Sequence, residues 1–283
     1  MTLAKQQHYI PQFYLNYFGK RRKKSHQIWC YDLKDEKAYL TSVGKIAREK
    51  DYYNVDVSDD CFISLEESLS KIERFVAPAY ANLVRHMNPR ALRMEERVFI
   101  AAFCATLLTR VPRFGEEQRA IEDQIRDKLG DNNEVYKKLK MSDNQLKAFA
   151  KNMLDTSLMQ FTPILCAMQW TIGLAKLHAF VHTSDNPFLR HNPCDSGLRG
   201  NLGLLCKGIQ LALPLTPFLV LYMYYENDYP RQGDFLFIDN DNALHIKSML
   251  LYNATRYLFA QNECDFFIEK ELRKKKVIFA KPT

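Results

Sequence analysis

The stretch SLEESLSKIERFVAPAYANLVRHM, residues 64–87, marks the point where the chain changes from strand-like to helical patterning. Apolar residues recur in it about every 3.6 positions, which places them on one face of a helix. The members of this face are Leu65, Leu69, Ile72, Phe75 and Val76. Ser64 and Glu67 have the spacing of a capping box at the start of a helix. We therefore predict a helix over residues 64–87.

Upstream of this helix the pattern predicts strands. Residues 27–33 (QIWCYDL) and 38–43 (AYLTSV) flank a short polar turn, which is typical of a β-hairpin. Before the hairpin, Pro11 is suited to the first turn of a helix, and we predict a short helix over residues 11–18. The basic run KRRKK, residues 20–24, lies between them and is predicted to be a solvated loop.

Downstream, helical patterning continues and then gives way to strands. Residues 93–129 predict a second long helical region, which Pro112 kinks or breaks. A third helix is predicted over residues 142–168, with Ser142 or Asp143 as its cap. The later elements are strands at residues 170–174 paired with 177–183, further strands at 209–213, 218–224 and 234–238, and a helix at 243–261.

These elements place the chain in the α+β class. The order is an N-terminal short helix and β-hairpin, a central layer of long helices, and a C-terminal antiparallel or mixed sheet with a late helix. We predict a single domain over residues 1–283, since the loop 190–208 is the only compositional break. Its parts are an N-terminal module (1–60), a helical layer (61–168) and a sheet with a helix (169–283).

The composition is that of a folded protein. Of the 283 residues, 47% are hydrophobic and 26% are charged, which excludes wholesale disorder. The seven cysteines show no CxxC or Cys/His metal spacing, so we expect buried free thiols in a reducing cytoplasm. The N-terminus lacks the apolar core of a signal peptide.

One apolar stretch, residues 161–181, is long enough to cross a membrane. Lys176 and His178 fall inside it, and Pro163 and Gly173 interrupt it. A buried helix end followed by a strand accounts for this pattern better. We therefore predict a cytoplasmic protein without a membrane segment; the sequence does not indicate an oligomeric state.

The net charge of +7 is concentrated at one end of the chain. Residues 1–50 hold 11 Lys or Arg and 4 Asp or Glu, whereas residues 51–283 hold 29 of each kind. The excess is densest in Lys20, Arg21, Arg22, Lys23 and Lys24. Such a run is suited to the phosphate groups of nucleic acid, and it is equally typical of a solvated loop.

One motif with side chains typical of catalytic sites is HYIPQ, residues 8–12. His8 lies beside a predicted helix N-terminus, whose dipole favours a neutral imidazole. Such an imidazole can act as a base, a metal ligand or a hydrogen-bond partner. Gln12 lies in the first turn of the same helix. The alternative is that His8 and Gln12 cap buried backbone.

A second motif is TSDNPF, residues 183–188, where a predicted strand ends in a turn. Asp185 and Asn186 would be catalytic there, because a strand end is rigid and the loop beside it is open. The alternative is an Asx turn, in which Asp185 accepts a hydrogen bond from nearby backbone.

A third candidate is Asp51, which follows the predicted hairpin. Asp51 and Asp185 would together hold a divalent cation, which prefers hard oxygen ligands. The alternatives for Asp51 are a salt bridge to the surrounding Arg48 and Lys50, or simple solvation.

Arg110 precedes the predicted kink at Pro112 and is a candidate phosphate ligand, as are Lys20, Arg21, Arg22, Lys23 and Lys24. The alternative for Arg110 is an ion pair within the helical layer. Glu73 follows the apolar Ile72 and would be half-buried, so it needs a partner that Arg110 of the neighbouring helix would supply.

The sequence resembles a widespread, mostly bacterial family that is catalogued as domain of unknown function 4238. Its hallmark HYxPxFYLxxF reads HYIPQFYLNYF here, with Asn16 where the family often has a basic residue. The further matching stretches are IWCYDL (28–33), EKDYYN (49–54), LEESLSKIE (65–73), TRVP (109–112), TSDNPF (183–188), LPLTP (213–217) and NATRYLFA (253–260). The resemblance implies a single domain and shared features at His8, Gln12, Asp185 and Asn186, and it implies no activity.

Two functions follow from these residues. The first is a nuclease-like or other hydrolase of a phosphate-bearing substrate, with a divalent metal held by Asp51 and Asp185. The residues of its site would be His8, Gln12, Asp51, Asp185 and Asn186. The second is a non-catalytic module that binds nucleic acid or a protein through the basic N-terminal loop. The sequence contains no Walker A motif, GxGxxG, GxSxG, HExxH or kinase signature.

Overall fold

The structure is a computed structural model. It describes residues 6–23, 25–50, 52, 54–58, 61–64, 66–194, 201–230, 233, 235–267 and 270. The chain divides into two units. The helical unit comprises residues 1–10, 47–80 and 93–167, and the sheet unit comprises residues 11–46, 81–92 and 168–283. The predicted α+β class is confirmed; whether the two units form one domain stays a prediction.

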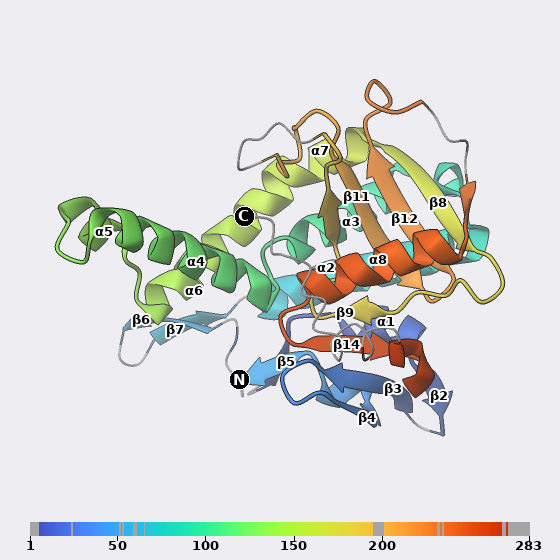
Figure 1. The fold of residues 1–283 in the computed structure, drawn as a ribbon, viewed down its shortest axis with the longest axis horizontal. Helices are drawn as coiled ribbons and strands as arrows, with labels where there is room; N and C mark the ends of the chain where they lie inside the picture. Colours follow the sequence, from blue (N-terminus) through green and yellow to red (C-terminus); the bar gives the residue numbers. More distant parts are fainter. Residues whose placement is uncertain are drawn as a thin grey trace. The chain divides into compact units, whose positions relative to one another are not determined.

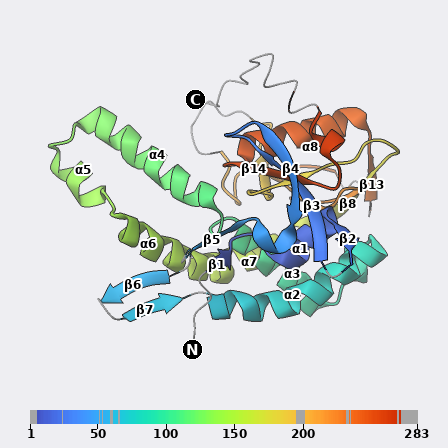
Figure 2. The ribbon, with the colours of Figure 1, turned by 90° about the horizontal axis from the view of Figure 1, so that it is seen from below.

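The helical unit consists mainly of helices that follow one another along the chain. They are α2 (Glu66–His86, of which residues 66–80 belong to this unit), α3 (Met94–Leu107), α4 (Pro112–Leu129), α5 (Glu134–Leu139), α6 (Asp143–Thr156), a π-helical turn (Ser157–Phe161) and α7 (Thr162–Ala167). Helix α3 packs against α7, and α4 and α6 lie side by side with α5 joining them (Figure 2). Two antiparallel strand pairs complete the unit: β1 (Gln6–His8) with β5 (Arg48–Lys50), and β6 (Asn54–Ser58) with β7 (Cys61–Ser64).

The helix boundaries follow from local chemistry. Pro112 opens α4 because the first helical turn needs no N–H from it, and this confirms the predicted break. Ser142 caps α6: its hydroxyl accepts from the N–H of Gln145, and the Gln145 side chain accepts from the N–H of Ser142. Helix α2, predicted over residues 64–87, differs from the prediction at its start. Ser64 ends β7 and the helix begins at Glu66, so Ser64 is not its cap.

The sheet unit is built around a five-stranded sheet in the order β10-β11-β12-β8-β13. Its strands are β8 (Gln169–Ala175), β10 (Leu189–His191), β11 (Gln210–Thr216), β12 (Leu219–Tyr224) and β13 (Phe235–Ile238). The pairs are antiparallel except that of β13 with β8. Helix α8 (Asn240–Asn253) covers one face through Ala243, Ile246 and Leu250 (Figure 1).

A second sheet in this unit has the order β2-β3-β14-β9, with β4 paired to β3. Its strands are β2 (Lys20–Arg22), β3 (Ser25–Asp32), β4 (Lys37–Ser42), β9 (Thr183–Ser184) and β14 (Tyr257–Ala260). The predicted hairpin is therefore present as β3 and β4. The predicted short helix is present as α1 (Gln12–Leu15), continued by a 3-10 turn (Asn16–Phe18).

Three predictions for this unit were wrong. Residues 177–183 do not pair with β8, because the chain turns at His178, whose φ is +70°, and only Thr183–Ser184 is a strand, paired with β14. The helix predicted over 243–261 ends at Asn253, and Tyr257–Ala260 is instead a strand between β3 and β9. The basic run is not a loop throughout: Lys20–Arg22 pairs with β3, although all three side chains are exposed.

Six cysteines are free thiols: Cys30, Cys104, Cys166, Cys194, Cys206 and Cys264. Cys30 and Cys104 are buried as predicted, whereas Cys194 and Cys264 are exposed. Among the described residues, no single helix has both the length and the apolar character needed to cross a membrane; α3 and α4, bent by 44° at their junction, pass such a test only when taken together.

Candidate functional site

The helical unit contains a cleft of about 720 Å³ between α4, α6 and the end of β5. Its walls follow the helical period, since every third or fourth residue of α4 and α6 lines it. On α4 these residues include Pro112, Gly115, Glu116, Arg119, Ala120 and Asp123, and on α6 Asp143, Leu146, Lys147, Ala150, Lys151 and Leu154. The volume lies within the range of about 300–1,000 Å³ that is common for small-molecule sites.

The floor of the cleft is apolar. Tyr52, just after β5, packs against Leu69 and the buried Leu154, and its ring lies 5.5 Å from that of Tyr9. Phe114 of α4 lies 5.9 Å from a stacked ring of α6, Phe149. The contact of Phe114 with Phe149 joins α4 to α6, and Tyr52 packs between α2 and α6.

Most acidic side chains of the cleft have arginine partners. Glu116 pairs with Arg113 at 3.6 Å, Asp123 with Arg126 at 2.9 Å, and Asp143 with Arg119 at 2.6 Å. These pairs are partly exposed and contribute little to stability, but they compensate the carboxylate charge.

The lysines of the cleft are different. Lys147 and Lys151 lie four residues apart on the face of α6 that lines the cleft, an arrangement that slightly destabilises a helix through like-charge repulsion. Lys50, at the end of β5, adds a third ammonium group. Within the part of the chain that the structure describes, Lys50 and Lys151 form no ion pair. The uncompensated charge of the cleft is therefore positive.

Glu49 is the one carboxylate of the cleft that has no arginine partner among the described residues. Glu49 is exposed on β5, but partial desolvation beside the cleft raises the pKa of its carboxyl above the ordinary value, and the nearby Lys147 lowers it only in part. The cleft thus combines a carboxyl group with three ammonium groups above an apolar floor.

Arg110 braces the base of the cleft. Its guanidinium donates to the backbone carbonyl of His8 at 3.0 Å and to Glu73 at 3.0 Å, and its side chain is 2% exposed. The predicted pairing of Glu73 with Arg110 is confirmed. Arg110 holds β1, α2 and the start of α4 together.

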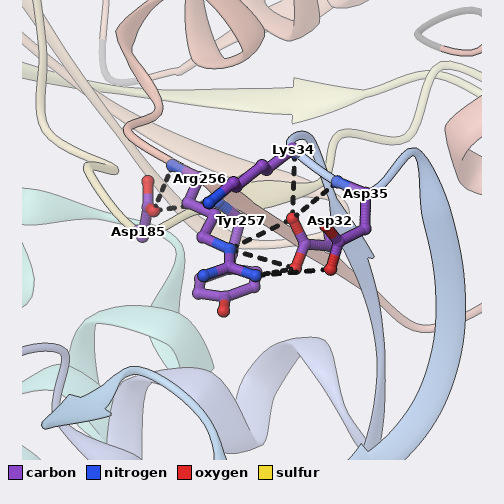
Figure 3. A network of polar contacts seen from close by, with 6 residues as sticks. All are labelled: Asp32, Lys34, Asp35, Asp185, Arg256 and Tyr257. Carbon is purple, nitrogen blue, oxygen red and sulfur yellow. Dashed lines mark hydrogen bonds and ion pairs between the residues drawn. The ribbon is translucent and has the colours of Figure 1, made fainter.

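A second cluster of motif residues lies in the sheet unit around Asp185 (Figure 3). Asp185 follows β9 and is 1% exposed. Its carboxylate accepts from three successive backbone N–H groups at the start of β14: Thr255 at 2.9 Å, Arg256 at 2.7 Å and Tyr257 at 2.8 Å. Asp185 therefore joins the loop after β9 to the start of β14. An Asx turn would instead use backbone N–H groups about two residues after Asp185, so these contacts differ from that alternative.

Asp32 and Arg256 form the other half of this cluster (Figure 3). The Arg256 Nε donates to both Asp32 oxygens, at 3.1 and 3.0 Å, and its Nη2 donates to Oδ2 at 2.7 Å. Burial works to raise the pKa of Asp32, but the hydrogen bonds from Arg256 and from the N–H groups of Asp35 and Lys34 outweigh it and hold the pKa below the ordinary value. The ion pair ties β3 to the start of β14.

Other predicted residues of the sheet unit also bond to the chain itself. Asn186 donates to the carbonyl of Asn253 at 3.1 Å, and Asn253 donates in return to the carbonyl of Asn186. The Tyr14 hydroxyl, from the hallmark motif, lies 2.6 Å from the Thr183 hydroxyl and donates to the carbonyl of Pro214 at 2.9 Å.

The structure distributes the predicted site residues over both units. His8 and Arg110 belong to the helical unit, and Gln12, Asp185 and Asn186 belong to the sheet unit. Lys20, Arg21, Arg22 and Lys23 also belong to the sheet unit, whereas Asp51 and Lys24 lie outside the described residues. No group of three or more metal-ligating side chains gathers among the residues that the structure describes. The catalytic, metal-binding and phosphate-binding roles of these residues stay predictions.

Sequence reasoning missed the residues that define the cleft, namely Glu49, Lys50, Lys147 and Lys151. One signal was present: Lys147 and Lys151 have the i,i+4 spacing that places two like charges on one helical face. Glu49 and Lys50 lie on β5, whose pairing with β1 helps to place them beside the cleft. Both strands are only three residues long, and their sequences do not predict this pairing.

Comparison with known proteins identifies a family without an assigned activity. A family model described as "Protein of unknown function (DUF4238)" matches residues 6–263. No curated protein and no solved structure matches the chain. The matched range includes both the cleft and the cluster around Asp185.

Proposed function

We propose that this chain, which belongs to the protein family of unknown function DUF4238, binds a phosphate-bearing ligand in the cleft of its helical unit and hydrolyses it. The observation that carries the proposal is the charge of the cleft. Glu116, Asp123 and Asp143 are compensated by arginines, whereas Lys50 and Lys151 form no ion pair among the described residues, and Lys147 lies on the same face of α6 as Lys151.

The proposed ligand would explain why two lysines that repel each other lie on one face of α6. Lys147 and Lys151 repel each other on α6, and side-chain entropy is lost when long side chains are held in place. A phosphate group between them and Lys50 would turn this repulsion into charge-assisted hydrogen bonds.

The reaction proposed is the addition of water to phosphorus. The Glu49 carboxylate takes a proton from the attacking water, the new P–O bond forms, and the P–O bond to the leaving group breaks. The leaving oxygen takes a proton from solvent and Glu49 then returns its proton to solvent, which balances the hydrolysis. The lysines would compensate the charge that develops on the phosphoryl oxygens. The proposed step requires no metal, and the hydrolysis assay is run with and without a divalent cation.

Binding is tested by titrating the full chain with inorganic pyrophosphate in a calorimeter. Replacing Lys147 and Lys151 with alanine is expected to weaken binding about tenfold or more, because hydrogen bonds to charged groups contribute about 1.5–3 kcal/mol each. The matched control replaces Lys128 and Lys138, two exposed lysines of α4 and α5 outside the cleft, and keeps the affinity. Equal affinities of both double variants would reject the cleft as the site.

Hydrolysis is tested with p-nitrophenyl phosphate and bis(p-nitrophenyl) phosphate, each with and without Mg²⁺ or Mn²⁺. Glu49→Gln is expected to lower the rate about 100-fold or more, since a positioned base contributes about 10²–10⁴-fold. The matched control is Glu117→Gln on α4, outside the cleft, which keeps the rate. A rate that Glu49→Gln leaves intact would remove the proposed base, and no turnover of either substrate would leave binding as the function.

A second candidate function is contact with nucleic acid through β2. Lys20, Arg21 and Arg22 are exposed there, and pairing with β3 holds them on a regular strand. Replacing Arg21 and Arg22 with alanine should then weaken binding of single-stranded DNA and reduce its salt dependence, by about one unit of log–log slope for each lost phosphate contact. An unchanged slope would argue against this surface.

A further inference from the structure

A glycine in the wall of the cleft has no explanation within the chain. Gly115 lies in the second turn of α4, where glycine is among the least favourable residues, and its backbone does not need the left-handed conformation. A Cβ placed there would meet only Leu146, at an ordinary 3.8 Å. The space beside Gly115 is therefore open to the cleft and is not required by packing.

The cleft gives this open space a chemical character. Tyr52, Leu146 and Leu154 supply an apolar and aromatic lining. Charged side chains flank this lining at successive turns of both helices: Glu116, Arg119 and Asp123 on α4, and Asp143, Lys147 and Lys151 on α6. An occupant that complements this lining is apolar or aromatic beside Tyr52, Leu146 and Leu154 and polar beside the flanking charges.

We propose that the phosphate-bearing ligand of the cleft is a nucleoside phosphate, with its base lying in the space beside Gly115 and its phosphate among the lysines. This rests on the proposed function, because it identifies the ligand of the same site. A nucleobase has π faces that stack on aromatic and apolar side chains, and hydrogen-bonding edges that charged side chains can satisfy. A long acyl chain would instead remove the flanking charges from water without replacing their hydrogen bonds.

Gly115 is, in this reading, the residue that determines specificity for the base. A larger side chain at this position would occupy the space of the ring and leave the lysines unchanged. Binding of the base and binding of the phosphate are therefore separable by substitution, and this makes the proposal testable apart from the proposed function.

The experiment titrates the full chain with adenosine 5′-monophosphate, ribose 5-phosphate, pyrophosphate and decyl phosphate. The nucleotide is expected to bind about tenfold or more tightly than ribose 5-phosphate, since stacking of one base contributes about 1–3 kcal/mol. Equal binding of these two ligands, or tighter binding of decyl phosphate, would overturn the proposal. Binding of pyrophosphate alone would overturn it and leave the proposed function standing, whereas no binding of any phosphate would remove the proposed function itself.

Substitution at Gly115 provides the second arm. Gly115→Leu is expected to weaken nucleotide binding about tenfold, the loss that corresponds to about 1.4 kcal/mol, and to keep pyrophosphate binding. The matched control Gln118→Leu adds the same side chain to α4 outside the cleft and should keep both affinities. Loss of both affinities in Gly115→Leu, with a normal circular-dichroism spectrum, would overturn the proposal.

If Gly115→Leu fails to fold, Gly115→Ala replaces it. Its Cβ makes one ordinary contact, so its melting temperature should equal or exceed that of the unmodified chain, and nucleotide affinity alone should fall. An unchanged nucleotide affinity would contradict the position of the base. The affinity for a trinucleotide is then compared with the affinity for the mononucleotide. Tighter binding of the mononucleotide indicates a free nucleotide as ligand, and tighter binding of the trinucleotide indicates the end of a strand; both results support a nucleoside phosphate.

Discussion

Replacing Asp185 with asparagine tests whether this carboxylate is part of the architecture or part of a catalytic site. Asn retains one acceptor oxygen, which can stay with the two N–H groups now bonded to Oδ2, from Arg256 and Tyr257. Its NH₂ group then takes the place of Oδ1 and faces the N–H of Thr255, a donor against a donor. The substitution therefore loses one hydrogen bond outright and removes the charge from two others.

The magnitude follows from these contacts. A hydrogen bond to a charged group contributes about 1.5–3 kcal/mol, and a buried donor without an acceptor costs about 1–3 kcal/mol. Because Asp185 is 1% exposed, solvent does not replace the lost acceptor. We expect Asp185→Asn to lower the free energy of unfolding by about 2–4 kcal/mol, a large part of the roughly 5–15 kcal/mol that is typical of a domain.

The assay is urea unfolding followed by circular dichroism, with the m-value compared between variants. The matched control is Asp228→Asn, in the same unit, whose carboxylate accepts a single backbone N–H from Gly208 at 2.7 Å. Its amide oxygen can keep that bond, so a loss below about 1 kcal/mol is expected. An Asp185→Asn chain as stable as the unmodified one would refute the architectural role and favour the catalytic one.

Three further predictions concern single contacts. Glu73→Gln removes the carboxylate that pairs with the buried Arg110 and should lower the free energy of unfolding in urea by about 1–3 kcal/mol. The loss is smaller than for a fully buried pair because the Glu73 side chain is 28% exposed. An unchanged free energy of unfolding would mean that the pair does not stabilise the unit. Tyr14→Phe removes the hydroxyl that bonds Thr183 and should cost about 1–2 kcal/mol, whereas an unchanged urea midpoint would contradict the buried contact. Burial, with a smaller contribution from a nearby lysine, lowers the pKa of His182 from 6.5 to about 3, so the unfolded chain takes up a proton that the folded chain does not, and stability should fall as the pH drops from 6.5 towards 3. His182→Gln should lose that part of the pH dependence, and identical slopes for both chains in urea titrations at several pH values would contradict the assignment.

The sequence predicted those elements whose pattern is strong over a local stretch. The hairpin of β3 and β4, the break before α4 at Pro112 and the cap of α6 at Ser142 each follow from side chains within a few residues of the element. The pairing of Glu73 with Arg110 was also predictable, because a half-buried carboxylate needs a cation and a neighbouring helix offered one.

The elements that were missed depend on distant partners. Residues 257–260 read as helix because YLFA follows a helical stretch without a break, yet pairing with β3 and β9 makes them a strand. This pairing is fixed in part by Asp185, 70 residues or more earlier in the chain, whose carboxylate gathers the N–H groups at the start of β14. Tertiary contacts of this kind override local propensity.

The candidate site was predicted least well, and for a related reason. Motif residues such as Asp185 and Asn186 attract attention because their types are those of catalytic groups, but in the structure both bond to backbone of the chain. The cleft is built from ordinary residues, Lys147 and Lys151 on one helix and Glu49 on a three-residue strand. These residues form a candidate site only because the fold brings them together in space, and no short stretch of sequence shows this.

The claim that the cleft binds a nucleoside phosphate is tested by calorimetry of adenosine 5′-monophosphate binding to the full chain and to the double variant in which Lys147 and Lys151 are replaced by alanine. If the cleft holds the phosphate, binding is saturable with one site per chain, is weakened about tenfold or more in that variant, and is unchanged in the control at Lys128 and Lys138. Binding that the cleft lysines do not affect, or that the control weakens equally, would contradict it.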